Sequence, residues 1–170
     1  NTNHGGVTNF ARQAVARMNL ALANNKLDSL FRFRLVGVSC VKSMATGDMG
    51  RILQGWTFSW SSIKSDRERY GADVVALVMD TGSSFGTTGI GYSLEGVSTQ
   101  EIQAMSDLAY CVVSARAVMM DFTMVHEVGH IMGLGHADRQ SIEPGPQSTS
   151  YASGYYFTGN DEVKYHTIMA

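Results

Sequence analysis

The residues best suited to chemistry lie in one stretch, residues 126–136, which reads HEVGHIMGLGH. His126 and His130 are four residues apart, a spacing that on an α-helix corresponds to about 40° of rotation and about 6 Å of rise. Two imidazoles so placed lie on adjacent turns of one face and can bind the same metal ion. Glu127 follows His126 directly. Because it is not needed as a ligand, it can hold and deprotonate a zinc-bound water.

The second half of this stretch supplies a third ligand. Gly133 lies three residues after His130 and can end the helix in a left-handed turn, which a side chain would resist. The chain then reverses and brings His136 toward the other two histidines. Three protein nitrogens leave the fourth tetrahedral position of zinc open to water, which is typical of a catalytic site. We therefore predict one catalytic Zn2+ held by His126, His130 and His136, and Glu127 as the catalytic residue.

A short HExxH pattern also arises by chance in unrelated helices, so an ordinary helix is the alternative. Here the pattern is extended by Gly133 and by a third histidine at the expected spacing. Of the five histidines in the chain, three fall within this stretch. The extended spacing therefore favours a metal site over a chance match.

The composition is that of one globular catalytic domain spanning residues 1–170. Hydrophobic residues make up 44% and charged residues 16% of the chain, and the formal net charge is −2. This charge gives no electrostatic reason to bind nucleic acid or an anionic membrane. The apolar run at residues 74–79 is far shorter than the roughly 20 residues that a membrane-spanning helix needs. We expect a monomer with no membrane insertion.

Two features bear on the compartment. The sequence opens with neither an initiator methionine nor an apolar signal core, as a processed enzyme would, so we expect a secreted or cell-surface protein whose signal or propeptide has been removed. Cys40 and Cys111 each lie in an apolar, strand-like run. They could form a disulfide, which would suit a secreted enzyme, or remain buried free thiols.

Hydrophobic periodicity predicts three helices that frame this stretch. Residues 8–25 and 61–70 have apolar positions at helical spacing. Residues 117–132 are predicted to form the single helix that carries the metal-binding stretch, capped by Asp121 or Thr123.

The same patterns predict strands between these helices. Residues 30–41 alternate and then become apolar, and residues 74–79, 90–94 and 108–114 are short runs typical of strands. Residues 52–60 could be a short strand or a loop, since their periodicity did not decide it. Strands alternating with helices imply an α/β layer with a mostly parallel sheet.

The stretch at residues 126–136, followed by Thr167-Ile168-Met169-Ala170, resembles the metzincin zinc endopeptidases. Their signature is HExxHxxGxxH and, further on, a tight turn whose methionine packs beneath the zinc site. Met169 is the only methionine after His136. Residues 14–35, 70–77 and 89–92 are similar to the reprolysin (adamalysin)-like branch, especially its bacterial members.

This resemblance implies an α/β metzincin fold. It has a twisted, mostly parallel five-stranded sheet with one antiparallel edge strand, and long helices that include the zinc-binding active-site helix. A substrate cleft would separate an N-terminal lobe, residues 1–136, from a small C-terminal lobe, residues 137–170, which contains the Met-turn.

The resemblance also places the antiparallel edge strand at residues 89–94. A free edge offers unpaired N–H and C=O groups, to which an extended peptide can add as another strand. The expected substrate-binding residues on this edge are Gly89, Ile90, Gly91 and Tyr92. The glycines would let the peptide backbone approach closely.

The function we expect is zinc-dependent endopeptidase activity on protein or peptide substrates. The alternative is a catalytically weak, zinc-containing adhesion or binding domain on the same fold. An intact Glu127 argues against that alternative, because the glutamate has no structural duty as a ligand. Three neighbouring aromatic residues, Tyr155, Tyr156 and Phe157, are either core or loop anchors or the wall of a substrate pocket.

Overall fold

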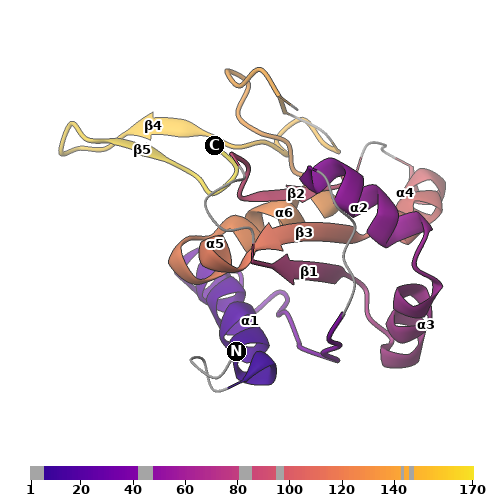
Figure 1. Ribbon diagram of the computed structural model, residues 1–170. Coiled ribbons are helices and arrows are strands. Elements are labelled where there is room, and N and C mark those ends of the chain that lie inside the picture. Colours follow the sequence, from indigo (N-terminus) through magenta and orange to yellow (C-terminus); the bar gives the residue numbers. More distant parts are fainter. Residues whose placement is uncertain (1–5, 42–47, 81–85, 95–97, 143, 146–147) are drawn as a thin grey trace.

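The computed structural model describes residues 6–41, 48–80, 86–94, 98–142, 144–145 and 148–170 (Figure 1). Its helices are α1 (Val7–Asn24), α2 (Met49–Phe58), α3 (Ser61–Tyr70), α4 (Thr99–Met105), the 3-10 turn η1 (Ser106–Leu108), α5 (Ala115–Met120) and α6 (Thr123–Ile131). Its strands are β1 (Val75–Met79), β2 (Gly89–Gly91), β3 (Tyr110–Ser114), β4 (Tyr156–Thr158) and β5 (Lys164–His166). This is the mixed α/β class that the sequence predicted.

The main sheet has the strand order β1-β3-β2. Strand β3 pairs in parallel with β1, starting at Val75 opposite Tyr110, and antiparallel with β2, with Gly89 opposite Val113. The antiparallel edge strand predicted near residue 90 is therefore confirmed as β2. The central strand is wholly buried, and Val112 and Val113 have no exposed surface, as expected for a strand covered on both faces.

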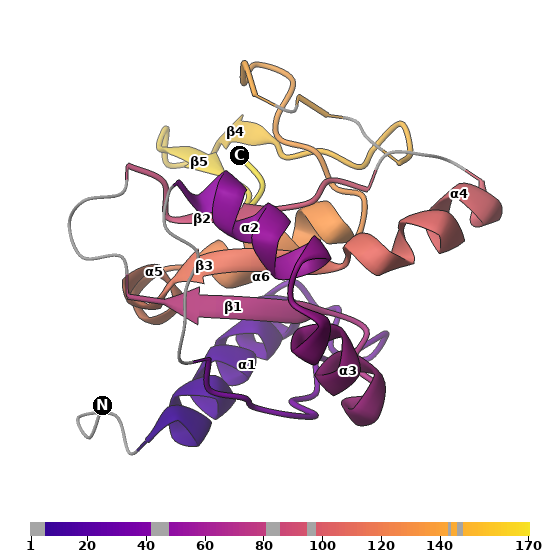
Figure 2. The ribbon, with the colours of Figure 1, turned by 45° about the vertical axis from the view of Figure 1, so that its right-hand side comes forward.

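Helices cover both faces of this sheet (Figures 1 and 2). Alternate residues of β3 belong to different core clusters, because successive side chains of a strand point to opposite faces. On one face Tyr110 and Val112 pack with α2 and α3. On the other face Cys111 and Val113 pack with α1, α5 and α6. The metal-binding helix is thus held against the centre of the sheet.

The prediction of five strands in one sheet is wrong for the described residues. The main sheet has three strands, and β4 and β5 form a separate antiparallel hairpin. Residues 30–41, where a strand was predicted, form none. Instead the Phe33 N–H donates to Asn19 Oδ1 at 2.8 Å, and Asn19 Nδ2 donates to the Phe33 carbonyl at 2.9 Å. The backbone of Phe33 is therefore hydrogen-bonded to a side-chain amide of α1 and not to a neighbouring strand.

Residues 52–60, which we expected to be a strand or a loop, lie mostly in helix α2. Its buried residues are Met49, Ile52, Leu53 and Trp56, which follow the helical spacing of three and four. The side chain of Asp48 caps this helix by accepting the Arg51 N–H at 2.9 Å. Both signals are visible in the sequence. The cap and the first helical residues lie before residue 52, outside the range predicted as a strand or a loop.

The helices predicted at residues 8–25 and 61–70 are confirmed as α1 and α3. The helix predicted at residues 117–132 is instead divided into α5 and α6 at Asp121, whose backbone is extended. The Asp121 carboxylate accepts the Thr123 N–H at 2.8 Å, so it starts the second helix as it stops the first. Arg17 of α1 donates to the Asp121 carbonyl at 3.1 Å. Among the described residues, no helix is long and apolar enough to cross a membrane.

Candidate active site

Helix α6 ends in a turn that places the third histidine. Gly133 has φ +88°, the left-handed conformation predicted for it. Its N–H donates to the His130 carbonyl at 2.9 Å, and the Leu134 N–H donates to the Gly129 carbonyl at 2.9 Å. This pair of bonds is the Schellman arrangement, in which a left-handed residue satisfies the last carbonyls of a helix. The chain reverses there and returns His136 to the helix.

Each histidine of the stretch is oriented by a backbone carbonyl. The His126 Nδ1 lies 2.7 Å from the Ile168 oxygen, and the His130 Nδ1 lies 2.9 Å from the Leu134 oxygen. The His136 Nδ1 lies 2.7 Å from the Ile142 oxygen. A carbonyl only accepts, so each Nδ1 carries the proton and each Nε2 presents a lone pair. The sequence did not reveal these acceptors, because any residue type can supply a carbonyl.

The three Nε2 atoms converge on one point. Their separations are 3.2 Å between His126 and His130, and 3.1 Å from each of these to His136. Two nitrogens bound tetrahedrally at about 2.0–2.1 Å from zinc are about 3.3 Å apart. Three lone pairs facing one another at this distance repel unless a cation lies between them, so the donor set fits the predicted zinc ion.

The protonation of His130 agrees with this arrangement. Its side chain is buried, and burial, with a further contribution from the neighbouring His126, lowers its pKa to about 4. At neutral pH the imidazole is therefore uncharged, which is the form that binds a metal.

Met169 lies beneath the helix, as the Met-turn resemblance implied. It is 7% exposed, and a methyl group added to Gly129 would lie 2.7 Å from its sulfur. The preceding residue, Ile168, supplies the carbonyl that orients His126. This turn therefore contacts the site through both a side chain and the backbone.

Glu127 is 6% exposed and lies under the edge strand β2. A methyl group on Gly89 would be 2.5 Å from the Glu127 Oε1, and one on Gly91 would be 2.9 Å from the Glu127 carbonyl oxygen. Both glycines thus face the helix and make room for this carboxylate. We expected them to make room for a peptide. Ile90 packs on the other face of the strand.

The cysteines are not bridged in the structure. Cys111 is a buried free thiol on β3, whereas Cys40 is exposed. Burial, with Glu127 adding to the effect, raises the pKa of the Cys111 thiol far above its usual value. Cys111 therefore remains protonated and serves as a small core residue.

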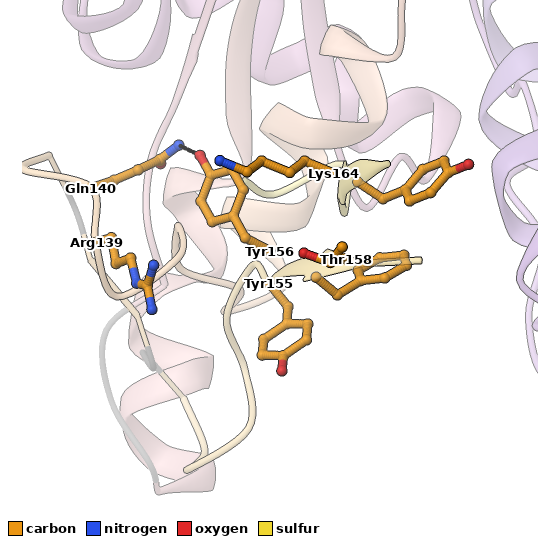
Figure 3. Close-up of a pocket in the computed structure, with 8 residues that line it drawn as sticks. Arg139, Gln140, Tyr155, Tyr156, Thr158 and Lys164 are labelled. Carbon is orange, nitrogen blue, oxygen red and sulfur yellow. Dashed lines mark hydrogen bonds between the residues drawn. The ribbon is translucent and has the colours of Figure 1, made fainter. Parts of the chain in front are cut away.

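The aromatic residues at 155–157 are exposed, which excludes a place in the core and leaves the other two alternatives, a loop anchor or the wall of a substrate pocket. Tyr155 is 66% exposed and Phe157 47% exposed. They line an open hollow of about 710 Å³ between the β4–β5 hairpin and the segment after His136 (Figure 3). His166 is also exposed and contacts the ring of Tyr156. Asp138 is exposed and is not among the acceptors of the histidine Nδ1 atoms.

Taken together, these features define a class. Two histidines on one helix, a third from the turn that follows and a buried glutamate beside the first are the parts of a mononuclear metallohydrolase. The chain belongs to the metallo-peptidase family M12B, reprolysin-like, whose pattern matches residues 10–137. This confirms the resemblance seen in the sequence: the chain contains a reprolysin-like metallopeptidase domain.

The similarity to one relative supports membership of the same family. The chain is 38% identical over 113 residues to "Peptidyl-Asp metalloendopeptidase" of Pseudomonas aeruginosa. The aligned part covers 61% of this chain and 18% of that protein, so the chain spans less than a fifth of the relative's length.

Proposed function

We propose that this chain is a catalytic domain that hydrolyses peptide bonds within protein substrates, with His126, His130 and His136 holding a zinc ion through Nε2. The observation that carries the proposal is that the three histidine Nε2 atoms lie 3.1–3.2 Å from one another, beside a buried carboxylate. When bound, zinc would supply Lewis-acid chemistry, polarising the scissile carbonyl and making water more acidic.

Glu127 is the proposed general base and then general acid. Its carboxylate takes a proton from the attacking water as the water oxygen bonds to the scissile carbon. It then delivers that proton to the amide nitrogen as the carbon–nitrogen bond breaks, which gives an amine and a carboxylic acid. The acid then loses the second proton of the water to solvent and leaves as a carboxylate. Gly89 lies so close to the Glu127 side chain that an added methyl group would clash with it. This close approach limits the rotamers of Glu127, which would keep it ready for the transfer.

The outer edge of β2 is the proposed place for the peptide backbone. Within the described residues β2 pairs only with β3, which leaves its other side free to pair with an extended segment. The name of the Pseudomonas relative refers to aspartate, and we propose a preference for bonds beside acidic residues here too.

The test is hydrolysis of casein by the purified chain, with and without a zinc chelator, with zinc content measured on the same sample. We expect one zinc per chain, activity that the chelator abolishes, and recovery on adding zinc. Exposed His166→Ala is the matched control and should retain both zinc and activity. Hydrolysis that persists without metal would overturn the proposal. Zinc binding without any hydrolysis would favour the alternative, an adhesion or binding domain.

A further inference from the structure

The hollow beside the β4–β5 hairpin is lined by both cationic and aromatic side chains. It is lined by Arg139, Gln140, Tyr155, Tyr156, Phe157, Thr158, Lys164 and Tyr165. Figure 3 shows Gln140 reaching Tyr156 and Lys164 of the hairpin from the segment that also carries Arg139. The rings of Phe157 and Tyr165 stack with centroids 5.5 Å apart.

The positive charges of this hollow are not neutralised within the part of the chain that the structure describes. Arg139 and Lys164 make none of the ion pairs found there, which join Arg51 to Asp48, Lys64 to Asp107 and Arg69 to Asp66. The turn of the hairpin contains two carboxylates, Asp161 and Glu162. Asp161 accepts the Tyr165 hydroxyl at 2.6 Å and the Val163 N–H at 3.1 Å, and Glu162 makes none of these ion pairs.

The hydroxyl of Tyr156 adds a further donor. Gln140 Nε2 donates to the Tyr156 oxygen at 3.2 Å. Because this oxygen already accepts a bond, its own hydrogen is left to donate to a ligand. An ammonium, a guanidinium and a phenol hydroxyl around one hollow are donors suited to a carboxylate.

Both chain segments that form the hollow lead to residues that orient the histidines. The segment that contains Arg139 leads to Ile142, whose carbonyl orients His136. The hairpin closes where the Thr167 N–H donates to the Tyr155 carbonyl at 3.0 Å. The next residue, Ile168, orients His126. A ligand in the hollow is therefore held by the segments that fix two of the three histidines.

We propose that this hollow binds an acidic side chain of the substrate, with Lys164 and Arg139 as specificity-determining residues. The inference rests on the proposed endopeptidase function. Lys164 and the Tyr156 hydroxyl would bind the carboxylate directly, and Arg139 would approach it from the other segment.

The experiment compares two quenched fluorescent peptides that are identical except for one central Asp or Asn. The enzymes are the wild type, Lys164→Met, Arg139→Ala and the double variant. Lys164→Met keeps the apolar stem, and Lys164→Arg keeps the charge. Arg32→Ala, which removes an exposed arginine on a distant segment, is the matched control for net charge.

We expect the wild type to prefer the Asp peptide about tenfold or more in kcat/KM, since charge-assisted bonds exceed neutral ones. The double variant should lose most of this preference through a higher KM for the Asp peptide. Its kcat/KM for the Asn peptide should change less than about threefold. Lys164→Arg and Arg32→Ala should keep the preference. Raising the salt should weaken it, because exposed charges are screened over about 8–10 Å.

A second measurement does not depend on turnover. The same peptides, labelled with fluorescein, are titrated onto zinc-loaded Glu127→Ala and onto the triple variant that also lacks the two cations, with binding followed by anisotropy. Tighter binding of the Asp peptide that the triple variant loses supports the inference even if no enzyme form hydrolyses a peptide. Equal binding of the two peptides, or a preference that survives loss of both cations, would overturn it.

Discussion

The metal-binding helix and the β4–β5 hairpin are held in opposite ways. On α6, Val128 is 2% exposed, His130 3% and Glu127 6%. Every residue of β4 and β5 is exposed, and Figure 1 shows the hairpin extending away from the three-stranded sheet. In the first region, the surrounding atoms fix the side-chain rotamers. In the second region, the side chains are held mainly by the stacking of their own rings.

This difference suggests how the two regions divide the work. Proton transfer requires a donor and an acceptor held within a few tenths of an ångström, which only a packed environment provides. Recognition of a flexible peptide tolerates exposed side chains that adapt to their ligand. Substitutions in the helix should therefore change kcat, whereas substitutions in the hairpin should change selectivity.

The largest effect should follow from Glu127→Ala. Removing a general base costs about 10²–10⁴-fold in rate, and we expect a loss of this size in kcat with casein. Zinc content should be unchanged, because the ligands are three histidines. Glu68→Ala, on an exposed face of α3, is the control. Near wild-type hydrolysis by the Glu127 variant would remove the mechanism proposed here.

The next effect tests the contact between β2 and the helix. Gly91→Ala places a methyl group 2.9 Å from the Glu127 carbonyl oxygen and 3.4 Å from its Oε2. A displaced catalytic group can cost about 10²-fold, so we expect kcat to fall by about 10–10²-fold with zinc still bound. Gly86→Ala is the matched control, because nothing lies within 4 Å of that added methyl. If the two variants behave alike, the glycine has no positioning role.

A moderate effect is expected from Met169→Ala. Truncating a buried methionine costs about 2–5 kcal/mol, so thermal unfolding should shift to lower temperature. Zinc affinity should fall as well, because Ile168 beside it orients His126. Met120→Ala, at a residue that is 67% exposed, should leave both unchanged. A Met169 variant of normal stability would show that the turn does not support the helix.

The smallest effect should come from the hairpin. Phe157→Ala removes a ring that stacks on Tyr165 at 5.5 Å and on Tyr155 at 6.4 Å. Exposed aromatic pairs contribute about 0.5–1.5 kcal/mol, so denaturant unfolding should show a loss within that range. Hydrolysis of a neutral peptide should be nearly unchanged. A loss as large as that of Met169→Ala would mean that the hairpin is part of the core.

Much of the candidate site could be predicted from the sequence, because helical spacing fixes which side chains share a face. His126, His130 and the left-handed Gly133 follow from local geometry alone. The same holds for α1, whose apolar residues follow helical spacing, and for β1, which is a short continuous apolar run. Secretion, the monomeric state and the division into two lobes remain predictions.

The errors have local causes as well. Residues 30–41 have the alternation of a strand, yet the amide of Asn19 supplies the partner that a neighbouring strand would have given. Asp121 divides the predicted helix because its carboxylate competes for a backbone N–H. Such choices depend on one side chain, and periodicity over a whole segment does not detect them.

The sequence by itself determined which residues are proposed as metal ligands and as the base, since both proposals depend on residue type and on spacing within a few turns of chain. Only the tertiary structure decided what orients them. The carbonyls of Ile142 and Ile168 and the glycines of β2 come from distant segments. Backbone atoms and absent side chains leave no distinct pattern in a sequence, so only the folded chain shows that they meet at the site.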